Sequence, residues 1–395
     1  MEVTSSSNTG LRKFLDNVCA IPVGEVFMIV RVHLRRSIKS HITPMSTIKL
    51  EVALTSEFFG RENYLEADCR LMGLFIKSDS NFSTISLLQE INECAIVFPL
   101  KSDIGHLSHY TITAPDEVGA YHLFIFPNEA DLSESIFKVR YVILPLLTDC
   151  FNVVSNDHAA MTQFIPPLLS CYRVIDGIII EEEYGKTVGS HVYDCSIGIL
   201  RYLALPNTVD GMTGSNVRSC SSNTPDRMTV AVELGAGCGL VSVWLAKRNK
   251  YNRVIATDMD NQLPLILRNI ERNNVQPVCS SKELNWSLTV GSERKAIESS
   301  QFSFKLQREY LGMHDDEHLD MIIAGDVMYS KSLAEDLITV LKAIAVPCVT
   351  LIYLAQKLRN ADRKDSYDIA SVPGIRCQCV WQEADVLVWK IFVVD

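Results

Sequence analysis

The sequence predicts an α/β fold with a doubly wound, Rossmann-like sheet over residues 171–395, preceded by a mainly-β, sandwich-like domain over residues 1–165. Two observations carry this prediction. In the first part, short runs rich in Val, Ile, Phe and Thr are separated by segments with Pro, Gly, Asn or Asp, and no long amphipathic helix intervenes. In the second part, apolar strands alternate with helices, which is typical of a sheet covered on both faces.

The composition is that of an ordinary globular protein. Of the 395 residues, 47% are hydrophobic and 21% are charged, which is enough to bury a sizeable core. The formal charge of −10 argues against binding nucleic acid by bulk charge. The 12 cysteines include no CxxC pair, so we expect reduced thiols and no metal site. Because we find neither a signal peptide nor a run of eighteen apolar residues, we expect no membrane contact and a cytoplasmic or nuclear location.

Six strands are expected in the first domain. The segment before Tyr121 suits a turn into a sandwich strand, with the tyrosine hydroxyl bonded back to the corner, although an unrelated β-turn fits it as well. No catalytic constellation is found in this domain, so we expect it to act in recognition or scaffolding, with a possible role in choosing the substrate. The expected strands cover residues 25–34, 47–54, 93–98, 110–114, 121–126 and 135–144.

Five strands separated by helices are expected in the second domain, followed by an antiparallel terminal pair. The last helix is expected to begin at Ser332, with Glu335 completing a capping box. The expected strands cover residues 229–234, 253–258, 282–286, 320–326 and 347–354, and the terminal pair covers residues 375–380 and 386–394. The expected helices cover residues 195–205, 240–249, 262–274 and 332–345.

A glycine-rich turn, Glu233-Leu-Gly-Ala-Gly-Cys-Gly239, follows the first of these strands and leads into a helix. Its glycines let a ligand lie against the backbone, and the helix N-terminus offers unpaired amides. A dinucleotide fingerprint would need glycine at position 240, which is Leu240. Asp258 ends the next strand, where an acid either accepts ribose hydroxyls or caps the following helix.

The G-x-G-x-G spacing behind an acid resembles motif I of S-adenosylmethionine-dependent methyltransferases. Three further segments narrow the resemblance: Asp326-Val-Met-Tyr329 matches a D-x-x-Y signature, Val192-Tyr-Asp194 is similar to V-W-D, and Leu284-Asn-Trp286 is similar to L-D-W. Together they resemble family 16 of the seven-β-strand methyltransferases, over about residues 171–395. The characterised members of that family are largely protein lysine methyltransferases, so the resemblance implies a seven-stranded sheet and a protein substrate that presents a lysine.

The resemblance also implies S-adenosyl-L-methionine as the cofactor. Asp258 is implied to bind its ribose and Trp286 to lie against its adenine, while Asp326 and Tyr329 are implied to face the target amine. The full set of implied cofactor contacts is Tyr193, Glu233, Gly235, Ala236, Gly237, Asp258, Trp286 and Gly325.

Two alternatives to a protein lysine methyltransferase remain open at this point. One is a methyltransferase of RNA or of a small molecule. The other is a non-catalytic interaction protein that retains the methyltransferase fold. Three departures from the family pattern favour the latter: Tyr193 stands for Trp, Asn285 for Asp, and Gln356 for Glu.

Overall fold

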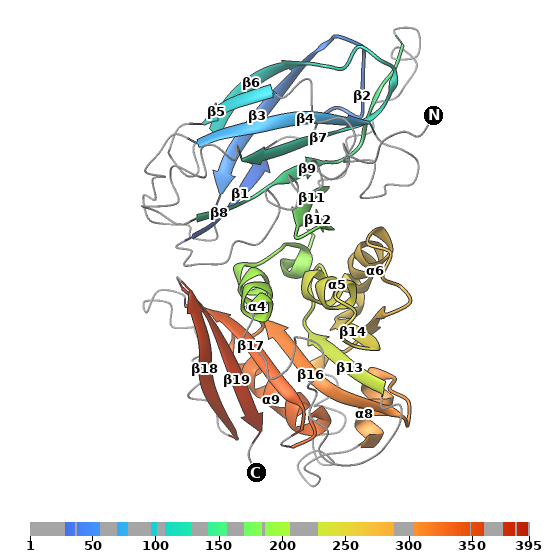
Figure 1. Cartoon of the computed structure of the whole chain (residues 1–395), viewed down its shortest axis with the longest axis vertical. Coiled ribbons are helices and arrows are strands. Elements are labelled where there is room, and N and C mark those ends of the chain that lie inside the picture. The colour runs from blue at the N-terminus through green and yellow to red at the C-terminus, as the bar shows by residue number, and fades with distance from the viewer. Residues whose placement is uncertain are drawn as a thin grey trace, which may run out of the picture. The chain divides into compact units, whose positions relative to one another are not determined.

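The computed structural model divides into two compact units, Met1–Lys186 and Thr187–Asp395 (Figure 1). The structure describes residues 28–35, 38–55, 69–77, 96–100, 107–127, 141–155, 170–183, 186–205, 228–287, 304–347, 349–358, 374–383 and 385–393. Parts of the expected strands, namely residues 25–27, 93–95, 135–140, 348 and 394, lie outside these ranges. Among the described helices, none is long and apolar enough to cross a membrane.

The described part of the first unit is built from two β-sheets. One has the strand order β6-β3-β1-β8, and the other has the order β12-β11-β9-β7-β10-β2, with β4 paired to β7 and β5 paired to β4. The strands are β1 (Met28–Leu34), β2 (His41–Ile42), β3 (Thr47–Thr55), β4 (Cys69–Lys77), β5 (Ile96–Leu100), β6 (Leu107–Thr113), β7 (Gly119–Pro127), β8 (Tyr141–Leu144), β9 (Leu146–Thr148), β10 (Phe151–Val153), β11 (Ser170–Ile175) and β12 (Ile178–Glu183).

One hydrophobic core joins the two sheets of this unit. Val32 and Leu50 from the first sheet pack in the same cluster as Leu123 and Phe151 from the second. Arg173 is buried between them: its Nε lies 2.8 Å from Oε2 of Glu182, and its Nη1 donates to the Val32 carbonyl. The expected mainly-β, sandwich-like domain is therefore confirmed. The Tyr121 hydroxyl also donates to the Glu117 carbonyl at 3.2 Å, which is the corner bond that the turn predicted.

The first unit extends beyond residue 165. Strands β11 and β12 form a hairpin, and β11 pairs with β9 of the same sheet, so these residues do not begin the second domain at residue 171 as expected. The hairpin turn is Asp176-Gly177, with φ of 49° and 73°. Two residues with positive φ between paired strands are the signature of a type I′ turn.

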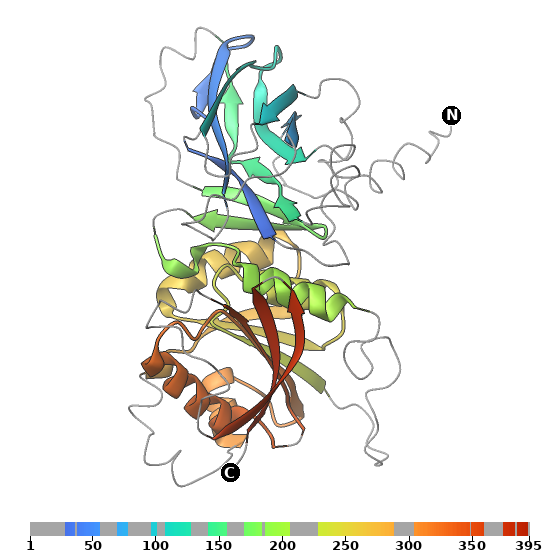
Figure 2. The same ribbon diagram turned by 90° about the vertical axis from the view of Figure 1, so that its left-hand side faces the viewer.

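The second unit is a seven-stranded sheet with helices on both faces (Figure 2). Its order is β15-β14-β13-β16-β17-β19-β18, in which the first five strands are parallel and β19 is antiparallel to both neighbours. The doubly wound sheet and its antiparallel terminal pair are therefore confirmed. The strands are β13 (Met228–Leu234), β14 (Arg253–Asp258), β15 (Cys279–Glu283), β16 (Glu317–Gly325), β17 (Leu351–Lys357), β18 (Ile375–Glu383) and β19 (Val386–Val393).

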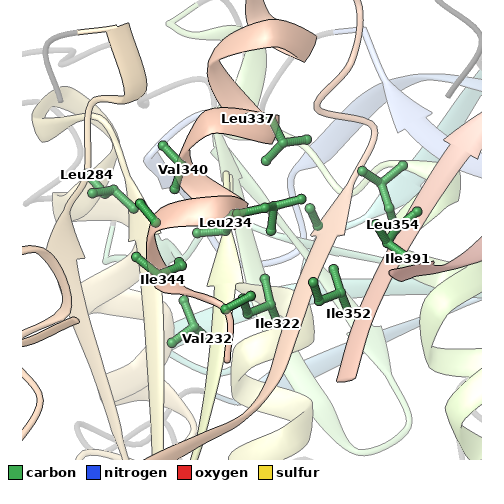
Figure 3. Packing of buried hydrophobic residues seen from close by; sticks show 14 of the residues in the cluster. Val232, Leu234, Leu284, Ile322, Leu337, Val340, Ile344, Ile352, Leu354 and Ile391 are labelled. Carbon is green, nitrogen blue, oxygen red and sulfur yellow. The ribbon is translucent and has the colours of Figure 1, made fainter. Parts of the chain in front are cut away.

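Side-chain alternation along β13 separates the two faces of this sheet. Val232 and Leu234 point into the core cluster that contains Leu337 and Ile344 of helix α9 (Figure 3). The intervening Glu233 points the other way and bonds to helix α5. The helices are α4 (Asp194–Ala204), α5 (Leu240–Lys247), α6 (Leu263–Arg272), α8 (Phe304–Leu311) and α9 (Lys331–Ile344), with short 3₁₀ turns at Val188–Ser190 and Asp260–Gln262.

Three details of the expected second domain were wrong. The fifth strand, β17, covers Leu351–Lys357 and not residues 347–354. The third strand, β15, ends at Glu283, so Trp286 follows the strand instead of ending it. Helix α9 is capped by Ser330, whose side chain accepts from the Leu333 amide, and not by Ser332. A cap is the residue whose side chain reaches the N2 or N3 amide, and Ser330, two residues before Ser332, meets that requirement.

Candidate active site

The candidate site lies at the carboxyl ends of the parallel strands, where the sequence motifs converge. The register pairs Leu234 with Ala324, and Gly325 with Ala355, so the segments that follow β13, β16 and β17 leave the same edge of the sheet. In doubly wound sheets this edge is where ligands bind.

The glycine turn after β13 needs glycine for its own geometry. Gly235, Gly237 and Gly239 have φ of 66°, 59° and 81°, in the left-handed region that side chains rarely adopt. A Cβ at Gly235 would lie 2.7 Å from Val327, and one at Gly237 would lie 2.7 Å from the Gly189 carbonyl oxygen. Glycine is therefore required in this turn because the segments that carry Val327 and Gly189 pack closely against it.

Asp258 holds this turn in place. Its Oδ2 accepts the Gly237 amide at 2.8 Å, and its Oδ1 accepts the Met259 amide at 2.7 Å. Burial raises the pKa of this carboxyl, and the two amide bonds oppose that rise. Each carboxylate oxygen has a further lone pair, so the group can still accept hydroxyls while it supports the turn.

Glu233 lies behind the turn and not in its mouth. The side chain is 2% exposed, and Oε2 accepts both the amide and the hydroxyl of Ser242 in α5, at 2.8 and 2.5 Å. Burial raises the pKa of Glu233 to about 7, against the two Ser242 bonds. The Glu233 carboxylate therefore joins β13 to α5.

Gln262 links the segment before α4 to the glycine turn by hydrogen bonds to both. The amide nitrogen of Gln262 donates to the Gly237 carbonyl at 3.0 Å, and its oxygen accepts the Thr187 hydroxyl. Tyr193 is half-buried at the start of α4, and its hydroxyl donates to the Val188 carbonyl. Tyr193 is thus held near the turn by the loop that carries it.

Trp286 and Gly325 approach from the two sides of β13. The Trp286 ring is half-buried, and it lies 3.7 Å from where a Gly235 Cβ would be. A Cβ on Gly325 would instead lie 3.5 Å from Ile199 of α4. Ala236, in the middle of the turn, is buried, and its amide donates to the Thr257 carbonyl at 2.9 Å.

Asp326 and Tyr329 begin the loop between β16 and α9. Asp326 has φ of 56°, and its amide donates to the Ala355 carbonyl at 2.9 Å. The cap of α9 is Ser330 and not Asp326. A non-glycine residue in the left-handed region at a strand end is often a sign of function. Tyr329 is 52% exposed and lies just before the helix cap.

Three charged residues at this edge were missed by sequence reasoning. Asp194 is the first residue of α4, Lys357 is the last residue of β17, and Asp385 lies between β18 and β19. The Lys357 ammonium lies 2.5 Å from Oδ2 of Asp194 and 3.8 Å from Oδ2 of Asp385. Asp194 ends the segment that resembles V-W-D, and Lys357 follows Gln356. Their pairing could not be predicted, because it depends on α4 and β17, which are far apart in the chain.

The residues at this edge fit a nucleoside that carries free ribose hydroxyls. The glycine turn carries only small side chains, Asp258 retains acceptor capacity, and Trp286 places an aromatic ring beside Gly235.

Comparisons with known proteins found a family model and two curated relatives that match part of this chain. A family model described as lysine methyltransferase matches residues 175–302. The protein-lysine N-methyltransferase EFM6 of Saccharomyces cerevisiae is 24% identical over 216 residues, which cover 51% of this chain and 79% of that protein. A UPF0665 family protein of Schizosaccharomyces pombe is 22% identical over 263 residues, covering 66% of this chain and 70% of that protein.

Solved structures with a similar arrangement were also found. A putative transferase from Pyrococcus horikoshii has a TM-score of 0.33 and 14% identity, and the match covers 58% of this chain and 74% of that one. TYW2 of M. jannaschii, solved in complex with AdoMet, has a TM-score of 0.32 and 13% identity, with 59% of this chain and 90% of that one covered.

The family match supports S-adenosylmethionine as the cofactor, and it agrees with the seven-stranded sheet and with the chemistry of the glycine turn. The family model matched at residues 175–302 thus confirms the resemblance to the lysine methyltransferase family that the motifs predicted.

Proposed function

We propose that this protein transfers a methyl group from S-adenosylmethionine to the side-chain amine of a lysine in a protein substrate. The observation that carries the proposal is Asp326. It stands at the carboxyl end of β16 in a left-handed conformation, it is tied to β17, and it is not the cap of α9. The lysine methyltransferase family model and the similarity to EFM6 support lysine as the acceptor.

The residues that would hold the cofactor are those around the glycine turn. Asp258 would accept the ribose hydroxyls, Trp286 would lie against the adenine, and Tyr193 would approach from the start of α4. When bound, S-adenosylmethionine supplies a methyl group on a positively charged sulfur, and its transfer to a neutral amine forms the N–C bond as the C–S bond breaks and leaves S-adenosylhomocysteine.

The chain's own contribution to this reaction is positioning. Holding an acceptor in line with a reacting group accounts for much of the rate of such transfers. The target lysine has an unperturbed pKa of about 10.4, so it arrives as an ammonium and must lose a proton before it attacks. The Asp326 carboxylate would attract and orient that ammonium, Tyr329 would complete the pocket, and water would take the proton.

We propose in addition that the first unit selects the protein substrate. Its described residues form a sandwich with a shared core. Arg173 and Glu182 form a buried ion pair in this unit, so we assign these two charges a structural role. A methyltransferase sheet needs no such domain for the chemical step, so the sandwich would act on which proteins reach the site.

The experiment that tests the proposal identifies the methylated atom. The full-length protein is incubated with S-adenosylmethionine that carries a radioactive methyl group, in a heat-treated cell lysate or in purified total RNA. After acid hydrolysis of the protein fraction, the label should appear as N-methyl-lysine and should be absent without added enzyme. Label in RNA or in small molecules would contradict a protein substrate. Binding of the cofactor without any transfer would favour a non-catalytic protein.

A further inference from the structure

We infer that Gln262 is a positioning residue of the cofactor site, which holds the segment Thr187–Tyr193 against the glycine turn before the cofactor binds. The inference rests on the proposed place of the cofactor at that turn, and it adds a residue that acts through others. Its basis is a directed chain of hydrogen bonds that joins Gln262 to Thr187, 75 positions earlier in the sequence.

The direction of each hydrogen bond in this chain follows from its last acceptor. The Gly237 carbonyl can only accept, so the amide nitrogen of Gln262 donates to it, at 3.0 Å. The amide oxygen of Gln262 therefore faces Thr187 and accepts the Thr187 hydroxyl. Because that hydroxyl donates its hydrogen to Gln262, the Ser190 hydroxyl donates to Thr187. The three hydrogen bonds thus run in one direction, from Ser190 to the glycine turn.

Most of this chain is buried. Gln262 is 3% exposed and Ser190 is 1% exposed. Buried polar groups cost free energy when they lose a partner, whereas a connected set of satisfied groups rigidifies the segments that it joins. An apolar side chain at position 262 would take a partner from both Thr187 and Gly237, so the connection depends on the amide group of Gln262.

The segment that Gln262 holds packs closely on the turn. A Cβ at Gly189 would lie 3.3 Å from the Cα of Gly237, and one at Gly237 would lie 2.7 Å from the Gly189 carbonyl oxygen. The Cys238 thiol also donates to the His191 carbonyl, with 3.6 Å between sulfur and oxygen. A displacement of this segment would therefore change the surface beside the turn.

Gln262 reaches a proposed cofactor contact through this segment. Thr187, which is bonded to Gln262, directly precedes Val188. The Val188 carbonyl in turn accepts the hydroxyl of Tyr193. A change at Gln262 would thus be transmitted to Tyr193, which is proposed to approach the cofactor from the start of α4.

The glycine turn keeps two further anchors when Gln262 is replaced. The Asp258 carboxylate accepts the Gly237 amide at 2.8 Å. The side-chain amide of Asn269 donates to the Cys238 carbonyl at 2.8 Å. Replacing Gln262 should therefore free the segment before α4 more than the turn itself. That segment would then be ordered only when the cofactor binds, and the cost of ordering it lowers affinity.

The test is a double-mutant cycle in the full-length protein. Its ligand is S-adenosylhomocysteine, so it needs neither a substrate nor turnover. Calorimetry gives the dissociation constant for the wild type, Gln262→Met, Thr187→Val and the double variant, and urea unfolding gives their stability. Gln307→Met is the matched control. Gln307 is a glutamine of α8 that is 2% exposed and donates to a backbone carbonyl at 2.6 Å, but that carbonyl belongs to Ile344, the last residue of α9.

We expect Gln262→Met and Thr187→Val each to weaken binding by about tenfold, and the double variant to lose about tenfold and not a hundredfold, because both changes break one connection. Gln307→Met should lose stability and bind as the wild type does. Losses that multiply in the double variant would overturn the inference. Wild-type affinity in Gln262→Met would also overturn it, with the proposed function intact. If the wild type did not bind, the cofactor assignment and the inference would fail together.

A second comparison keeps the inference testable if Gln262→Met does not fold. Thr187→Ser keeps the hydroxyl that donates to Gln262, whereas Thr187→Val keeps the shape of the side chain and loses the hydroxyl. We expect Thr187→Ser to bind S-adenosylhomocysteine nearly as the wild type does and Thr187→Val to bind it about tenfold more weakly. Equal affinities of these two variants would contradict the inference.

Discussion

The backbone amide of Gly237 donates a 2.8 Å hydrogen bond to Oδ2 of Asp258. One carboxylate thereby joins the glycine turn after β13 to the end of β14, in the position where the ribose of the cofactor is proposed to lie. The same side chain would shape the binding surface and contact the ligand, so its removal should affect affinity through both routes.

Asp258→Ala should weaken S-adenosylmethionine binding by about 1–3 kcal/mol, because charge-assisted hydrogen bonds to the ribose are lost and the Gly237 amide loses its acceptor. Titration calorimetry measures the change. Asp260→Asn, at an exposed position two residues away, serves as the control and should bind as the wild type does. Equal affinity of Asp258→Ala and the wild type would remove Asp258 from the cofactor site.

Gly237→Ala should abolish most cofactor binding, because the added Cβ would lie 2.7 Å from the Gly189 carbonyl oxygen in a backbone with φ of 59°. Gly177→Ala is the matched control. Its φ is 73°, but a Cβ there meets nothing within 4 Å, so the control should lose only the ~1–2 kcal/mol of left-handed backbone strain. Urea unfolding and calorimetry report the two effects, and a Gly177→Ala variant that also lost cofactor binding would contradict this account.

Glu233→Gln should flatten the pH dependence of stability between about pH 4.5 and pH 7. The folded-state pKa of Glu233 is raised to about 7 from 4.5, so the folded protein holds a proton that the unfolded chain has released. Wild-type stability should therefore fall as pH rises through this window, by up to ~3 kcal/mol at about 1.4 kcal/mol per pKa unit. The free energy of unfolding in urea, compared for wild type and variant, isolates this residue, and parallel profiles would show that Glu233 does not titrate this way.

A fragment of residues 187–395 should bind S-adenosylmethionine with an affinity close to that of the full chain, because every proposed cofactor contact lies within that unit. It should methylate the protein substrate less well if the first unit selects that substrate. Circular dichroism establishes that the fragment is folded, and a filter assay with labelled cofactor measures transfer. Equal transfer by fragment and full chain would rule out a recognition role for the sandwich.

The positions of the glycine turn and of Asp258 were predictable because they depend on local rules. Glycine adopts positive φ angles readily, so three glycines between a strand and a helix predict a tight turn, and all three of them have positive φ. The parallel strands β13, β14 and β16 were predictable for the same reason, since each contains an apolar run, whereas β15 has the polar sequence CSSKE.

The charged cluster was not predictable, because it depends on pairing between distant elements. Lys357 and Asp194 are separated by 163 positions in the chain, and only the packing of α4 on β17 brings their charges to 2.5 Å. The role of Glu233 was likewise hidden, since its position in motif I says nothing about Ser242 nine residues later. The β11–β12 hairpin had a local signal in Asp176-Gly177, but its sheet depends on the pairing of β11 with β9.

The central claim is that Asp326 acts on the acceptor amine and not on the cofactor. Asp326→Asn tests it most directly, because asparagine tolerates the left-handed backbone that Asp326 adopts and removes only the charge. We expect the rate of N-methyl-lysine formation at saturating cofactor to fall by roughly 100-fold, with the dissociation constant of S-adenosylmethionine unchanged. An unchanged rate, or a loss of cofactor affinity as large as the loss of rate, would contradict the claim.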